Sequence, residues 1–177
     1  DLANDLGNLV SRTTAMVQKY FGGTLPAGCK AWDAPEAYDT ELITLAAGLR
    51  GRYEEAMEAC APHKALEEVF KVIQRANKYI DESMPWALAK DMEANRARLA
   101  HVLYNLLETT RICGVLLTPF MPDSCEKLFS QIGAAADVQT WDSAARWGCL
   151  PEQTAVTKGE NLFPRIDMDQ AIAELEA

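Results

Sequence analysis

Helical periodicity runs through almost all of the first 133 residues, and prolines and glycines divide it into separate segments. Apolar residues that recur at steps of three and four predict amphipathic helices. We expect helices over about 1–20, 36–60, 62–83, 92–117 and 123–132. Because the connections between them are mostly short, the sequence predicts an all-α fold, an antiparallel bundle of about five helices.

The pattern weakens in the last part of the chain. Residues 134–177 combine short apolar stretches with prolines, so we expect an irregular C-terminal strap that packs back on the bundle. Within it, 142–147 are expected to form a helical turn or two, and 153–157 a short extended piece. The last ten residues are expected to form a short helix or a frayed end. We interpret 1–177 as one domain, with 1–133 as its main bundle.

Charge and composition exclude several classes of protein. The chain has 17 Lys and Arg against 26 Asp and Glu, a formal charge of −9. This balance argues against a broad phosphate-binding surface, but it permits a small site that reads bases. No run approaches the roughly 18 apolar residues of a membrane helix. Five widely spaced cysteines, without Cys-x-x-Cys, favour a reducing, cytoplasmic location over a disulfide framework.

The motifs of a self-sufficient enzyme are absent from the sequence. His63 and His101 are not spaced as a zinc site, and we interpret both as surface or boundary residues without a catalytic role. There is no Gly-x-Ser-x-Gly and no Gly-x-x-x-x-Gly-Lys. Acidic pairs such as Glu54 and Glu55 are interpreted as solvated helix faces. We therefore expect no catalytic residue, no metal and no cofactor in this chain.

Three polar or aromatic residues lie where a plain bundle does not need them. Asn8 and Arg12 are one turn apart beside the apolar stripe of the first helix. An amide and a guanidinium can read the edge of a base, although spacing alone favours a solvated face with an Asp-to-Arg pair. Pro85 ends a helix, so Trp86 is expected at an exposed corner. There its indole can stack on an unpaired base or plug the end of the bundle.

Two asparagines interrupt apolar stripes, and the other tryptophans lie in loops. Asn77 and Asn105 are interpreted as buried amides that order a neighbouring helix end, because burial requires a hydrogen-bond partner. Trp32, Trp141 and Trp147 are expected to hold loops against the core.

Five segments, taken together and in order, resemble the anticodon-binding domain of bacterial methionyl-tRNA synthetase, a class I aminoacyl-tRNA synthetase. They are residues 1–12, 77–82, 85–90, 117–122 and 162–166. Sister class I enzymes for leucine, isoleucine, valine and cysteine share a similar bundle and a Pro-Trp corner. Asn-Leu-x-Ser-Arg and Leu-Phe-Pro-Arg-Ile are the motifs that indicate methionine.

The resemblance implies specific roles for four residues. In the family, the equivalents of Asn8, Arg12 and Trp86 recognise the anticodon, chiefly its first base, a cytosine, and Pro85 shapes the corner. The implied partner is methionine tRNA. The full-length enzyme would be a methionine–tRNA ligase whose catalytic domain precedes Asp1 and uses ATP and Mg²⁺, with Zn²⁺ as a further candidate ligand of that domain. This chain alone lacks that catalytic domain.

Some members of the family carry a further C-terminal domain that binds tRNA and forms a homodimer. The acidic ending at 174–177 is where a linker to such a domain would begin. Two other hypotheses stay open at this stage. The chain could be a helical interaction or scaffold domain that binds another protein, or the anticodon domain of a sister synthetase.

Overall fold

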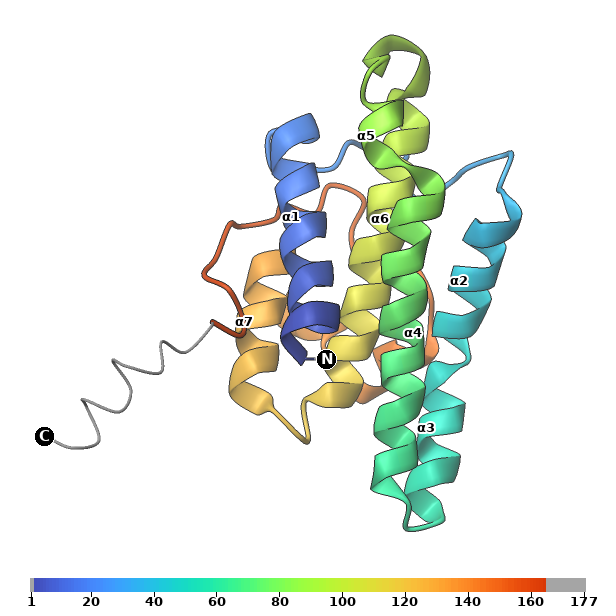
Figure 1. The fold of residues 1–177 in the computed structure, drawn as a ribbon, viewed down its shortest axis with the longest axis vertical. Helices are drawn as coiled ribbons and strands as arrows, with labels where there is room; N and C mark the ends of the chain where they lie inside the picture. The colour runs from blue at the N-terminus through green and yellow to red at the C-terminus, as the bar shows by residue number, and fades with distance from the viewer. Residues whose placement is uncertain (1, 165–177) are drawn as a thin grey trace, which may run out of the picture.

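Helices make up most of the chain in this computed structural model, which describes residues 2–164 (Figure 1). The α-helices of this part are α1 (Asn8–Phe21), α2 (Ala37–Ala47), α3 (Leu49–Glu58), α4 (Pro62–Ser83), α5 (Pro85–Leu88), α6 (Met92–Leu117) and α7 (Pro122–Ile132). A π-helix, Leu2–Gly7, precedes α1, and two 3-10 helices, Ala136–Val138 and Trp141–Ala145, follow α7. The prediction of an all-α bundle is therefore confirmed.

Three expectations concern residues outside the described range. They are the helix or frayed end of the last ten residues, the linker at 174–177, and the final part of the Leu-Phe-Pro-Arg-Ile motif, Arg165 and Ile166. The division of the chain at residue 133 also stays a prediction.

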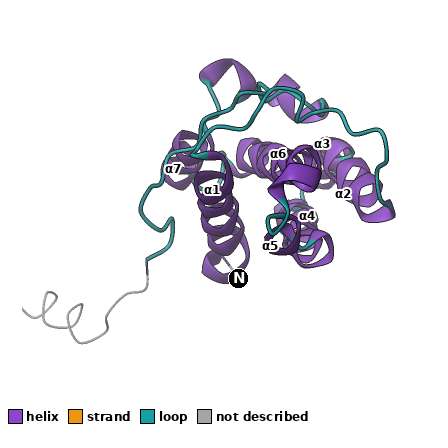
Figure 2. Cartoon of the chain, turned by 90° about the horizontal axis from the view of Figure 1, so that it is seen from above, coloured by secondary structure: helices purple, strands orange, loops and turns teal. Residues whose placement is uncertain are grey.

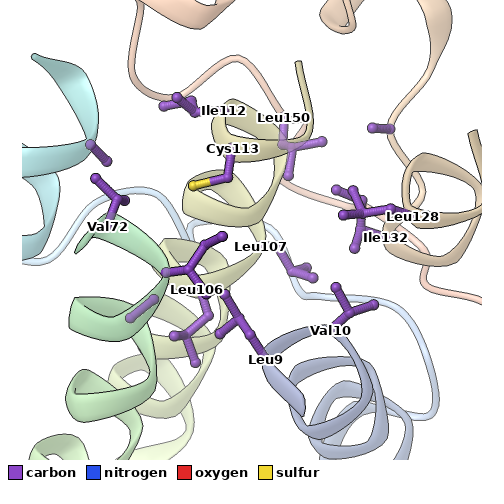
Figure 3. Packing of buried hydrophobic residues seen from close by; sticks show 14 of the residues in the cluster. Leu9, Val10, Val72, Leu106, Leu107, Ile112, Cys113, Leu128, Ile132 and Leu150 are labelled. Atoms are coloured by element: carbon purple, nitrogen blue, oxygen red, sulfur yellow. The ribbon is translucent and has the colours of Figure 1, made fainter. Parts of the chain in front are cut away.

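Helix α6 lies at the centre of the bundle. Every residue from Arg98 to Leu117 is buried, because α1, α2, α4, α7 and a 3-10 helix of the strap all pack against it. Figure 2 shows α6 between α1 and α7 on one side and α2 and α3 on the other. Figure 3 shows Leu9 of α1 and Leu106 of α6 pointing into the same packed region. Burial of each such leucine contributes about 1.5–3 kcal/mol.

The predicted helix over 36–60 is wrong in one respect, since it forms two helices that meet at Gly48. The Arg52 guanidinium folds back over Gly48 and donates to the carbonyl oxygen of Leu45 at 2.7 Å. A Cβ on Gly48 would lie 2.8 Å from that guanidinium. The guanidinium thus takes over a carbonyl at the end of α2, where the first helical ladder stops.

The first predicted helix begins with a π-helical turn. The side-chain amide of Asn77 donates to the carbonyl oxygens of Asp5 at 3.1 Å and of Ile73 at 3.2 Å. The Asn77 amide thus binds a carbonyl oxygen of the π-helix, which confirms that Asn77 orders a neighbouring helix end. The prediction that Asn77 is buried is wrong in degree, because the residue is half-buried. Asn105 is fully buried but contacts no helix end, because its amide faces Tyr79 and His101.

A buried ion pair anchors the strap to α6. Glu108 and Arg111 are both fully buried, and their closest atoms are 2.7 Å apart. The Glu108 carboxylate accepts hydrogen bonds from the backbone N–H groups of Gly148, Cys149 and Leu150 at 2.9 to 3.1 Å. Arg111 donates to backbone carbonyls on the same side. Two charges inside the bundle therefore hold the backbone of the irregular segment.

The rest of the strap adds an extended contact and a helical turn. Leu25 donates its N–H to Thr154, and Val156 donates to Gly23, so part of the expected extended piece pairs with the loop after α1. The expected helical turn is the 3-10 helix Trp141–Ala145. Trp141 donates to Glu54 of α3 at 2.8 Å, and this contact holds the loop as predicted. In the part of the chain described here, no helix is long and apolar enough to cross a membrane.

Candidate nucleic-acid interface

The outer face of α1 carries Asn8 and Arg12. Leu9, Val10 and Val17 of the same helix are buried against the core. Asn8 is consequently exposed, and Arg12, one turn later, is partly exposed. The amphipathic pattern therefore points both polar side chains away from the core.

A seam of polar contacts joins this helix to α4. Asp5 accepts a hydrogen bond from Gln74 at 3.3 Å, and Arg12 donates to Asp81 at 3.2 Å. Partners further along α1 lie further along α4, so the two helices run in the same direction (Figure 1). The seam ends at the ion pair, where the side chains of Arg12 and Asp81 are 34% and 67% exposed. An ion pair this exposed contributes only about 0–1 kcal/mol, so it costs little to open.

The corner after α4 presents Trp86. Helix α4 ends at Ser83, and Met84 adopts a left-handed conformation with φ 44° and ψ 62°. Pro85 is buried and opens α5, because its ring fixes φ for a first helical residue and cannot continue α4. Trp86 follows with 44% of its surface exposed, which confirms the expected exposed corner.

The four expected residues lie on two elements, Asn8 and Arg12 on α1 and Pro85 and Trp86 on α5. Asp81 lies two residues before the end of α4, and its ion pair with Arg12 ties the polar face of α1 to the helix that leads into the Pro85–Trp86 corner. Sequence reasoning missed Asp81 as the partner of Arg12. Asp81 lies in segment 77–82, which carries part of the family resemblance, and this was the signal that could have pointed to it. The pairing itself depends on how two helices far apart in the sequence align.

A groove borders the same face of α1. It has a volume of about 650 Å³, and Asn8 lies in its wall between the start of the chain and the strap. The opposite wall is formed by Asn161 and Phe163. Sequence reasoning missed this groove, because the strap reaches α1 only through tertiary packing.

A second polar cluster lies inside the bundle and is structural. Asp39 is fully buried and accepts hydrogen bonds from Arg98 and Tyr79. His101 contacts the carbonyl oxygen of Cys29 at 3.0 Å and Asn105 at 3.1 Å, so Nδ1 donates and Nε2 accepts when the ring is neutral. Burial lowers the pKa of His101, which favours that neutral form.

The placement of the histidines corrects part of the prediction. His101 is 5% exposed, so it is a core residue and not a surface or boundary residue, because the loop around Cys29 folds over it. His63 is exposed at the start of α4, as predicted. Among the described residues, no group of three His, Cys, Asp or Glu side chains is arranged to hold a metal ion.

These features define a class of protein, an all-helical domain that exposes polar side chains on α1 and an indole at the corner between α4 and α5. The chain belongs to the family described as the anticodon binding domain of methionyl tRNA ligase, whose model matches residues 25–176. The resemblance inferred from the five segments is thereby confirmed. It favours the methionine family over a sister synthetase or a scaffold domain.

Individual relatives agree with this assignment. The chain is 50% identical over 176 residues to a methionine–tRNA ligase of Caldanaerobacter subterraneus, and 50% identical over 177 residues to that of Clostridium tetani. The first match covers 99% of this chain and 27% of the relative, and the second covers 100% of this chain and 26% of the relative. This chain therefore spans about a quarter of the length of each relative.

Solved structures show the same fold. Mycobacterium tuberculosis methionyl-tRNA synthetase in complex with methionyl-adenylate matches with a TM-score of 0.83 and 34% identity. The match covers 93% of this chain and 31% of that one. The free form of the same enzyme matches with a TM-score of 0.84.

Proposed function

We propose that this domain recognises the anticodon of methionine tRNA within a longer methionine–tRNA ligase, which attaches methionine to that tRNA with ATP. The observation that carries the proposal is the ion pair between Arg12 and Asp81. It joins the exposed polar face of α1 to the helix whose end presents Trp86. A hydrogen-bonding edge and a stacking plane are what an unpaired base needs.

Each of the four residues has a distinct role in this proposal. The amide of Asn8 offers a donor and an acceptor, which suit the amino group and the ring acceptors of cytosine, the first anticodon base. The guanidinium of Arg12 offers only donors, so it pairs with the acceptors. The exposed indole of Trp86 supplies the stacking plane, and Pro85 fixes its direction.

The charge of the domain limits how the tRNA is held. A net charge of −9 provides little attraction for a phosphate backbone, so the domain contributes base contacts and the rest of the ligase contributes most of the phosphate contacts. The domain alone should therefore bind tRNA weakly.

The remaining partners belong to the proposal as well. ATP and Mg²⁺, and Zn²⁺ where one is held, are assigned to the catalytic domain, because the described residues offer no donor cluster for a metal. Besides methionine tRNA, the catalytic domain of the same chain is a partner of this domain. We also propose a cytoplasmic location, and a homodimer where a further C-terminal domain is present.

Binding of methionine tRNA to the full-length protein tests the proposal. Trp86→Ala should weaken binding by about 1–3 kcal/mol, because one stacked base is lost. Trp141→Ala is a matched control, since Trp141 is also an exposed indole, 36% against 44%, but it contacts α3. Substituting the first anticodon base should remove most of the difference between Trp86→Ala and the parent.

Three results would contradict the proposal. Unchanged affinity of Trp86→Ala would remove the stacking role. Absence of any RNA binding by the full-length protein would favour a scaffold domain. Tighter binding of a tRNA with a leucine, isoleucine, valine or cysteine anticodon would favour a sister synthetase.

A further inference from the structure

Asn8 is the first residue of α1, and the turn immediately before it is π-helical. The π-helix covers Leu2–Gly7, and Gly7 has φ −60° and ψ −41°, so the backbone passes from one helix into the other without a break. A π-helix bonds each residue to the fifth one along rather than the fourth, so it turns less per residue than an α-helix. The direction in which the Asn8 side chain points therefore depends on how this wide turn is held.

The side-chain amide of Asn77 holds the wide turn against α4. Its nitrogen donates to the carbonyl oxygen of Asp5, in the π-helix, at 3.1 Å, and to that of Ile73, one turn back on α4, at 3.2 Å. Gln74 adds a further contact, because its amide donates to the carboxylate of Asp5 at 3.3 Å. Asp5 is thus bound to α4 through both its backbone and its side chain, three residues before Asn8.

The two carbonyl oxygens set the orientation of the Asn77 amide. A flipped amide would turn its oxygen toward both of them, and acceptors repel each other. In the present orientation the Oδ1 atom is buried, and no group among the described residues donates a hydrogen bond to it. A buried acceptor without a partner costs stability, and an apolar side chain of similar size would avoid that cost. The two bonds to carbonyl oxygens are therefore what the amide contributes at this position.

Helix α4 connects Asn77 with the corner that carries Trp86. Asp81, the partner of Arg12, lies one turn after Asn77, so one face of α4 makes both contacts with the first helical segment of the chain. From Asn77 the helix continues to Ser83, about 9 Å at 1.5 Å per residue, and the corner follows directly. A continuous helix therefore joins the residue that holds the start of α1 to the exposed indole.

We propose that Asn77 is a positioning residue for anticodon recognition, which fixes the π-helical turn so that Asn8 meets the base on which Trp86 stacks. This inference rests on the proposed function, and it adds a residue that acts through Asn8 rather than on the base itself. Without the Asn77 amide, the carbonyl oxygen of Asp5 loses its bond to α4, and the start of α1 can shift relative to the corner. Hydrogen bonds are directional, so such a shift weakens the bond between Asn8 and the base.

Binding of methionine tRNA to the full-length protein tests the inference with Asn77→Leu. Leucine is close to asparagine in size but has no polar side-chain atom, so the substitution removes both donated bonds. Binding should weaken by about 2- to 12-fold, the equivalent of one neutral hydrogen bond. Asn95→Leu is the matched control, because Asn95 is also a half-buried asparagine but lies on α6, and its affinity should equal that of the parent. A circular dichroism spectrum identical to the parent's checks that each variant is folded.

Two comparisons distinguish positioning from a loss of stability. In the Asn8→Ala background, Asn77→Leu should cause no further loss of affinity, because the two residues act on the same hydrogen bond. In a second tRNA, uridine replaces the cytosine at the first anticodon position, which exchanges an amino donor for an oxygen acceptor. The preference of the parent for cytosine should shrink in Asn77→Leu. A smaller fraction of folded protein would instead lower the binding of both tRNAs by the same factor.

The outcomes separate this inference from the proposed function. If Asn8→Ala weakens binding but Asn77→Leu does not, the positioning role is overturned and the proposed function stands. The positioning role is also overturned if the Asn77→Leu penalty persists in the Asn8→Ala background, or if it is equal for the two tRNAs. If Trp86→Ala, Asn8→Ala and Asn77→Leu all leave affinity unchanged, both proposals fail.

A second substitution decides the question if Asn77→Leu does not fold. The hydroxyl of Asn77→Ser can bond to the Ile73 carbonyl oxygen within α4, but it is too short to reach the carbonyl oxygen of Asp5. Asn77→Ser should therefore show the same dependence on Asn8 and on the cytosine, and the same results would overturn the positioning role.

Discussion

Replacing Glu108 with glutamine should test what the buried ion pair contributes to stability. The Glu108 carboxylate is fully buried and contacts the Arg111 guanidinium twice, at 2.7 and 3.0 Å. It also accepts three backbone N–H groups of the strap. Glu108→Gln leaves the positive charge of Arg111 buried without a counter-charge, which typically costs about 3–5 kcal/mol.

Urea unfolding of the parent and the variant measures this cost. Since domains have stabilities of about 5–15 kcal/mol, the loss should appear as a large shift of the midpoint. Glu54→Gln is a matched control, because Glu54 also pairs with an arginine at 2.8 Å but is 41% exposed. It should cost less than about 1 kcal/mol. A Glu108→Gln cost no greater than that of the control would refute the argument that burial makes this pair important.

The remaining predictions concern substitutions at four single positions. Gly133 has φ +70°, and a Cβ there would lie 2.0 Å from the Ala155 carbonyl oxygen, so Gly133→Ala should lower the urea midpoint. Gly51 lies inside α3, and a Cβ there would meet nothing within 4 Å. Gly51→Ala should therefore raise stability by about 0.5–1 kcal/mol. Asp81→Asn should change stability by less than about 1 kcal/mol and tighten tRNA binding in a filter assay, because it removes a negative charge and frees the α1 guanidinium. Burial lowers the pKa of His101, so the unfolded chain binds the proton more readily than the folded chain. The free energy of unfolding should therefore fall as the pH drops below about 6.5. His101→Gln should reduce this dependence of the unfolding free energy on pH, measured from unfolding curves at several pH values.

The long helices were predictable because their sequence signals are local. Proline opens α4 at Pro62 and α5 at Pro85, and the apolar periodicity between these points predicted the bounds of α4 within a residue. The break at Gly48 was not predictable in the same way. It depends on Arg52 turning back onto Leu45, and the apolar pattern runs through the break without interruption.

The candidate site was predictable in its parts and not in its assembly. A proline before Trp86 was enough to predict an exposed corner, and helical spacing was enough to place Asn8 beside Arg12. Spacing could not show that α1 and α4 align so that Arg12 reaches Asp81. Nor could it show Glu108 and Arg111 as a buried pair, since charges three residues apart on a helix usually face solvent.

The backbone at Met84 has a consequence for the stiffness of the corner. A non-glycine residue held at φ 44° costs about 1–3 kcal/mol, and the surrounding contacts must offset it. The next residue is a buried proline whose ring removes another rotation. Two successive backbone restraints therefore leave the exposed indole with little more than its own side-chain torsions. If the proposed function holds, the backbone that carries this indole is already ordered when a base arrives, so little backbone entropy is lost at the moment of capture.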